Sequence, residues 1–243
     1  MTLPNEEVLD LLRDNFIVAS RNIERDRHVG VSHGYRTNQT AVGTTNGAGG
    51  RNVQLIVLAC DETVLHVLPG FWNPRDLVTE LLLALEVNRL HQDEERTAAE
   101  KAKLFATLHR SHLARHEASM LERSAWQDFD QHHEVMRAQT EKRDTFAVQG
   151  DGSQVLKTIP QLVHDRMVAR PFKKLADFGM ESFVDYGRPY YDNNSGVDQG
   201  RNFPRAVQEN EKRARELAKE RDEAETLKRK LEKAAKARAK TSG

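Results

Sequence analysis

Residues 53–68 read VQLIVLACDETVLHVL, which is two apolar runs separated by a short polar turn. The first run, Val53–Ala59, is almost continuously apolar and rich in β-branched residues, as in a strand that is covered on both faces. The second run, Val64–Leu68, predicts a second strand that returns after the turn and stops at Pro69 and Gly70, which interrupt strands. We therefore predict a β-hairpin.

A helix is expected directly after the hairpin. Asn73 is a favourable N-cap, Pro74 suits the first helical position, and Asp76 lies in the first turn, where a negative charge stabilises a helix. The apolar residues that follow have helical spacing and form a stripe of Leu77, Val78, Leu81, Leu82 and Leu85.

The segment before the hairpin predicts a helix, a strand and a loop. Residues 3–16 carry apolar side chains at helical spacing, and acidic residues lie early in this segment. Residues 16–19, FIVA, favour a short strand. Residues 30–50 are rich in Gly, Thr, Asn and Ser, which indicates a long loop.

The pattern after residue 87 is mainly helical. Residues 87–139 contain neither Gly nor Pro, which favours one or two long helices with a thin apolar seam. Residues 159–183 favour a short helical pair interrupted at Pro171. Residues 205–240 consist mostly of Ala, Glu, Lys and Arg, and predict an exposed charged helix or a weak coiled coil.

Together these patterns predict an α+β protein in three parts. Residues 1–92 form an α/β domain, and residues 93–204 form a helical extension that ends in an irregular aromatic segment. Residues 205–243 form a charged helical tail.

The composition of the chain argues against several classes of function and location. The 37 basic and 37 acidic residues balance, so nucleic acid is not expected as a partner. Cys60 is the single cysteine, which excludes an intramolecular disulfide and a four-thiolate zinc site. No apolar run approaches the about 18 residues of a membrane helix. The acidic residues near Met1 do not match a signal peptide, so a cytoplasmic location is expected for the chain as written.

The order of elements in residues 3–90 resembles the carboxy-terminal part of a thioredoxin-like domain. The stretch PNEEVLDLLRDNFIV (residues 4–18) resembles the helix and strand that follow the C-x-x-C motif in that family. The hairpin of residues 53–68, with PGF at 69–71 and Asn73-Pro74, resembles the closing hairpin and its exit into the last helix. The resemblance implies a thioredoxin-like fold in this part of the chain.

The chain lacks the residues with which that family carries out its chemistry. The first strand and the C-x-x-C turn would lie before Met1, and no proline stands near Arg51 and Asn52, where the family places a cis-proline. Disulfide exchange needs an attacking thiolate and a resolving thiol, and Cys60 alone cannot supply both. The resemblance therefore implies a non-catalytic member that uses no cofactor.

Two clusters are candidate sites. His109, His112 and His116 have spacings of three and four, which place them on one helix face, where histidines can bind zinc. A solvated polar face is the simpler interpretation, because Arg110 and Arg115 alternate with the histidines. The second cluster is aromatic and is interpreted either as a binding surface or as packing against the preceding helices. It consists of Tyr186, Arg188, Tyr190 and Tyr191.

Three functions remain open. We favour a non-catalytic thioredoxin-like module that binds a protein partner or acts as a scaffold. The alternatives are a thiol-disulfide oxidoreductase-family protein whose amino terminus, with its C-x-x-C, lies upstream and would carry an export signal, and a structural assembly subunit that forms homo-oligomers through its long helices.

Overall fold

The predicted hairpin is present in the computed structural model, which describes residues 2–33 and 44–192. Strand β2 (Gln54–Leu58) pairs antiparallel with β3 (Val64–Pro69), and a β-bulge lies between Val57 and Leu58. Every residue of β3 is buried. The expectation of a strand covered on both faces concerns residues 53–59 and is wrong there, because β2 is mostly half-buried and Val53 and Leu58 are 62% and 38% exposed. The described chain mixes helices and strands, which confirms the predicted α+β class.

The helices on either side of the hairpin also form where they were predicted. Helix α1 (Glu6–Asn15) begins at Asn5, whose side chain accepts a hydrogen bond from the backbone N–H of Val8. Helix α2 (Pro74–Gln92) begins at Asn73, whose side chain accepts from the backbone N–H of Arg75.

The strand predicted at residues 16–19 is wrong. This segment is irregular, and the side chains of Ile17 and Val18 are 101% and 68% exposed. A strand needs a hydrogen-bonded neighbour, and in the described part of the chain β2 pairs only with β3. The likeness to a thioredoxin-like domain thus stays a prediction that is carried by the hairpin and its flanking helices.

The long helices expected over residues 87–139 are divided into shorter ones. After α2, the chain forms α3 (Ala98–Ala114), α4 (Ala118–Glu122) and α5 (Asp128–Ala138). The prediction failed because these helices end and begin without Gly or Pro, and only α3 of the three begins with a side-chain cap. Thr97 and Glu100 form a reciprocal capping box at the start of α3.

The remaining elements are short, apart from one further helix. Strands β4 (Phe146–Val148) and β5 (Gln154–Leu156) form a second hairpin. Helix α6 (Ile159–Val168) follows a capping box of Thr158 and Gln161, as expected for the first member of the helical pair. A 3₁₀ turn, η1 (Leu175–Asp177), and α7 (Met180–Phe183) come next. Strand β1 (Val31–His33) pairs with β6 (Tyr190–Asp192).

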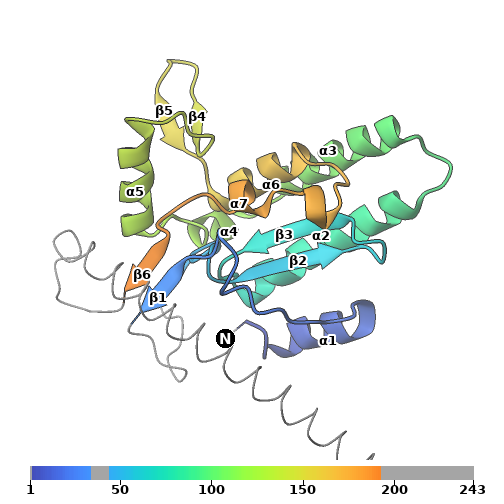
Figure 1. Ribbon diagram of the computed structural model, residues 1–243. Helices are drawn as coiled ribbons and strands as arrows, with labels where there is room; N and C mark the ends of the chain where they lie inside the picture. The colour runs from blue at the N-terminus through green and yellow to red at the C-terminus, as the bar shows by residue number, and fades with distance from the viewer. Residues whose placement is uncertain (1, 34–43, 193–243) are drawn as a thin grey trace, which may run out of the picture. The chain divides into compact units, whose positions relative to one another are not determined.

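A single hydrophobic core contains the hairpin and helices that lie both before and after residue 92 in the sequence. Helix α3 packs on α2 and α6, and α6 packs along β3 (Figure 1). Residues up to Tyr191 form one compact unit, so the expected boundary at residue 92 runs through packed structure. The largest fully buried apolar side chains are Leu65, Leu68, Leu81, Leu83, Phe105, Leu162, Met167, Phe178 and Phe183.

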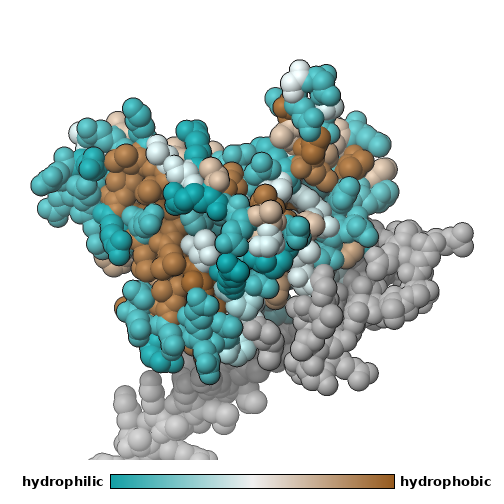
Figure 2. Space-filling view, turned by 180° about the vertical axis from the view of Figure 1, so that it is seen from behind, coloured by the Kyte–Doolittle hydropathy of each residue, from teal (hydrophilic) through white to brown (hydrophobic). Residues whose placement is uncertain are grey.

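Part of the apolar surface remains open to solvent. Figure 2 shows an apolar area on the face of the molecule that is hidden in Figure 1. Exposed leucines lie on both α1 and α2, which contact each other: Leu9 is 41% exposed and Leu82 is 48% exposed. Within the described residues, no helix is long and apolar enough to cross a membrane. The helical tail predicted for residues 205–243 lies outside the described residues.

Candidate metal centre

Glu80 is carried into the interior by α2. It lies one turn after Asp76, and both carboxylates are buried on the inner side of the helix among Leu77, Leu81 and Ala84. Asp76 is neutralised by Arg123 and accepts a further hydrogen bond from Asn46. No lysine or arginine is paired with Glu80 among the described residues; its partners are histidines. A buried carboxylate surrounded by imidazoles is unusual and calls for an explanation.

Helix α3 and the turn after it supply two of these histidines. His112 lies in the last turn of α3, and His116 lies two residues beyond its end. The turn continues the helical path, because the backbone N–H groups of Arg115 and His116 donate to the carbonyls of His112 and Leu113. The side chains of His112 and His116 are only 8% and 2% exposed.

The third histidine comes from α6. His164 is 2% exposed and lies in the middle of that helix, between Val163 and Asp165. The rings of His112 and His116 are 5.4 Å and 5.5 Å from the ring of His164, measured between centroids. Three helices that pack in one core therefore bring three imidazoles to one carboxylate.

The donor atoms of these four residues converge. One donor atom each from Glu80, His112, His116 and His164 can be chosen so that all lie within 4.8 Å of one another. Glu80 Oε1 is 3.2 Å from His116 Nε2 and 3.4 Å from His112 Nε2, and Glu80 Oε2 is 3.5 Å from His164 Nε2. A tetrahedral zinc site with metal–ligand distances of about 2.0–2.2 Å has donors about 3.3–3.6 Å apart. The three distances from Glu80 to the histidines are close to that spacing, and the four donors as a set lie within 4.8 Å.

These contacts are not hydrogen bonds. Glu80 Oε1 and the Nε2 atoms of His112, His116 and His164 are all buried without a hydrogen-bond partner. Buried polar atoms are nearly always paired, because an unpaired one costs about 1–3 kcal/mol. Four unpaired lone-pair donors that face one another are explained if a cation belongs between them.

Two further histidines, which are not donors themselves, contact Glu80 and His164 and fix their orientation. His66 on β3 lies 2.8 Å from Glu80 Oε2 through its Nε2, which leaves Oε1 directed at the histidine pair. His109 Nδ1 lies 2.8 Å from His164 Nδ1, so the other nitrogen of His164, Nε2, is the one that faces the cluster. Both His66 and His109 are fully buried. Such outer contacts fix the tautomer and orientation of a metal ligand.

The protonation states suit metal binding. Burial alone would raise the pKa of Glu80, but the neighbouring His164, His112 and His116 lower its pKa well below the ordinary value, so the carboxylate is ionised. Burial lowers the pKa of His164 and, more strongly, that of His109, so these imidazoles are neutral at pH 7. Ionised carboxylate and neutral imidazole are the forms that bind a metal.

The histidines singled out in the sequence therefore have two different positions. His112 and His116 contribute to the cluster, whereas His109 lies behind His164. The interpretation of this face as solvated is wrong, because α3 is covered by α2 and α6 and His109 is 0% exposed. Glu80, His164 and His66 were not among the predicted site residues, because they belong to other elements. The signal that could have found Glu80 is a carboxylate on the apolar side of the α2 stripe, between Leu77 and Leu81.

The predicted aromatic site is largely internal. Tyr186 is 4% exposed and donates a hydrogen bond to the carbonyl of Gly47, and Trp126 packs edge-on against its ring. Tyr191 donates to Asp130, and the guanidinium of Arg188 lies over Phe129. Tyr190 is part of β6. The packing interpretation therefore fits Tyr186, Arg188 and Tyr191.

Comparison with known proteins gives no further guide to this centre. No protein-family model, curated protein or solved structure matches the chain.

Proposed function

We propose that the folded part of this chain is a metal-binding domain that takes one divalent zinc ion between Glu80, His112, His116 and His164. The observation that carries the proposal is the convergence of four buried donor atoms that have no hydrogen-bond partner. Imidazole and carboxylate suit zinc and other late divalent metals, and the four donors lie within 4.8 Å of one another, close enough to surround one ion. The ion would hold α2, α3 and α6 together.

The zinc content of the purified protein tests the proposed metal centre directly. The tag-free protein is saturated with zinc, freed of loosely bound metal by gel filtration, and analysed by mass spectrometry of the elements. We expect about one zinc per chain for the wild type. The double variant His112→Asn, His116→Asn should retain close to none, because two of the four donors are removed.

A surface substitution controls for general histidine binding. His132 is exposed on α5, and His132→Asn should keep the full zinc content. Circular dichroism shows whether the double variant still folds. A wild type that holds no more zinc than a folded double variant would refute the metal centre.

The thioredoxin-like interaction module remains an alternative proposal. The exposed leucines Leu9 on α1 and Leu82 on α2 support it, because exposed apolar side chains on neighbouring helices are typical of binding surfaces. This role is compatible with a metal centre, since the surface and the centre use different residues.

A further inference from the structure

The candidate metal centre is closed in the structure, so an ion needs a way in. The rings of His112 and His116 lie edge to face with their centroids 4.9 Å apart, and the Nε2 atoms of all three donor histidines are buried. Glu80 is 0% exposed. A donor side chain must therefore move before zinc can reach or leave the four donors.

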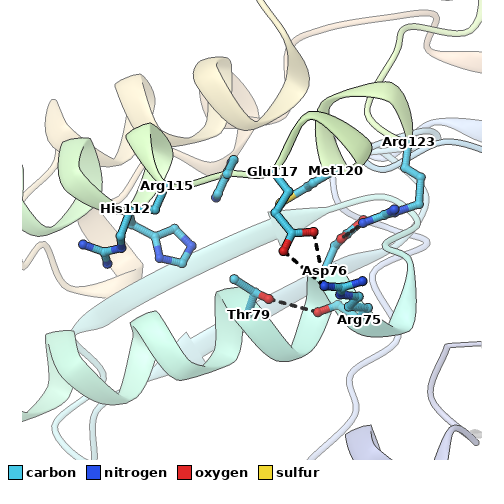
Figure 3. Close-up of a pocket in the computed structure, with 9 residues that line it drawn as sticks. Arg75, Asp76, Thr79, His112, Arg115, Glu117, Met120 and Arg123 are labelled. Carbon is cyan, nitrogen blue, oxygen red and sulfur yellow. Dashed lines mark hydrogen bonds and ion pairs between the residues drawn. The ribbon is translucent and has the colours of Figure 1, made fainter.

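A pocket borders the centre on the side of two of its donors. It has a volume of about 150 Å³ and lies between α2 and the segment that runs from the end of α3 into α4 (Figure 3). His112 and His116 are part of its wall, whereas Glu80 and His164 are not. A cavity of this size can hold a benzene molecule, so it has room for the smaller imidazole ring of a histidine.

Of the two donors at the pocket, His116 is the one that lies outside the helices. The other three donors lie within α2, α3 and α6, whereas His116 lies two residues past the end of α3. Glu80 and His164 are also each contacted by a further histidine at 2.8 Å. Within the described residues, neither ring nitrogen of His116 has a hydrogen-bond partner. No hydrogen bond therefore has to break when this ring turns.

The turn that carries His116 is weakly anchored. Arg115, Glu117 and Ala118 are exposed, and the helix that follows, α4, has five residues and begins without a side-chain cap. Glu117 accepts hydrogen bonds from Arg75 of α2 at 3.1 Å and 3.2 Å (Figure 3). The two side chains of this pair are 61% and 68% exposed, and exposed ion pairs stabilise a fold only slightly. Segments with few buried contacts open locally at a low cost in free energy.

We infer that zinc enters and leaves the centre through this pocket, when the turn opens and the ring of His116 rotates into the cavity. His116 is then the last donor to bind the ion and the first to release it. This inference rests on the proposed metal centre. It goes beyond it by giving the ion a route and its ligands an order of exchange.

A larger side chain in the pocket tests this route. Thr79 lines the pocket from α2, and Thr79→Trp fills the space into which the ring of His116 turns. The substitution raises the free energy of the open state alone, so zinc uptake and zinc release should both slow about 10–100-fold while Kd stays unchanged. Stopped-flow mixing of zinc-loaded protein with an excess of a chromogenic chelator gives the release rate, and the same chelator reports the zinc left unbound during uptake.

Two further variants complete the test. Glu86→Trp adds the same side chain at an exposed position of α2 that does not line the pocket, and it should exchange zinc at the wild-type rates. Glu117→Gln removes the ion pair with Arg75 that ties the turn to α2. Both rates should then rise about 2–5-fold, the factor that corresponds to an exposed ion pair, again at an unchanged Kd.

The outcomes separate this inference from the metal centre. A wild type that takes up no zinc at equilibrium would refute the centre itself. Wild-type exchange rates in a folded Thr79→Trp variant would overturn only the route, and so would a change in one rate without the other, because a route affects both directions equally. If circular dichroism shows that Thr79→Trp does not fold, unchanged rates in Glu117→Gln decide against the route.

Discussion

At the scale of single residues, the centre depends on histidines that do not touch the ion. His109 is fully buried and its Nδ1 is 2.8 Å from His164 Nδ1. If His164 binds metal through Nε2, its Nδ1 carries the proton and donates it to His109. His109 is therefore a positioning residue in our proposal, and its role can be separated from simple packing.

We predict that His109→Leu lowers zinc affinity about 10–100-fold, as loss of such an outer hydrogen bond typically does. His109→Gln should recover part of the affinity, because its amide oxygen can accept the proton of His164. Competition with a chromogenic zinc chelator gives both affinities. His132→Leu, at an exposed position, serves as the control. Equal zinc affinity in His109→Leu and the wild type would contradict the positioning role.

At the scale of elements, an acidic residue ties the segment after α7 to distant parts of the chain. Asp185 accepts hydrogen bonds from Arg137 on α5 at 2.9 Å and from Arg143 before β4 at 2.8 Å, and it also pairs with Arg51. Burial alone would raise the pKa of Asp185, but Arg137 and Arg143 outweigh it and hold the pKa well below the ordinary value.

We predict that Asp185→Asn lowers the free energy of unfolding by about 2 kcal/mol at pH 7, the scale of a charged hydrogen bond. The native pKa lies below the unfolded one, so this stabilisation is complete above the unfolded value of about 3.9 and disappears as the pH falls through the native pKa. Urea denaturation at pH 7 and at pH 3 measures both variants.

The control is a carboxylate with a surface partner. Asp165 pairs with Lys157, and its side chain is 54% exposed, so Asp165→Asn should change stability by less than about 1 kcal/mol. A difference between Asp185→Asn and the wild type that is as large at pH 3 as at pH 7 would show that the carboxylate charge is not its cause.

Local signals account for the elements that sequence analysis predicted correctly. The caps at Asn5 and Asn73 and the two apolar runs of the hairpin act within a few residues, so they are visible in the sequence. The strand at residues 16–19 failed because pairing depends on a distant neighbour. For the same reason only two of the four donors could be predicted. His112 and His116 are close in sequence, whereas Glu80 and His164 meet them only through the packing of the helices.

At the scale of the whole molecule, the ion would connect three helices of the core. We predict that zinc raises the melting temperature. At a free concentration of 100 times Kd the stabilisation is about 2.7 kcal/mol. In a chain of this size that corresponds to a rise of about 5–10 °C.

Thermal melts of metal-free protein with and without zinc test this. Glu80→Gln, compared with its own metal-free form, should show little zinc-dependent rise, because the charged donor is lost. An equal rise in both proteins would mean that zinc stabilises the chain elsewhere.

The wide separation of the donors along the chain has a kinetic consequence. An unfolded chain offers only His112 and His116 close together, and two imidazoles at a spacing of four hold zinc weakly. The complete donor set exists only after α2, α3 and α6 have docked. Interactions that are absent from the folding transition state act on the unfolding rate. If the three helices dock after the transition state, zinc slows unfolding and leaves the refolding rate nearly unchanged, so the ion stabilises the folded chain without speeding its formation.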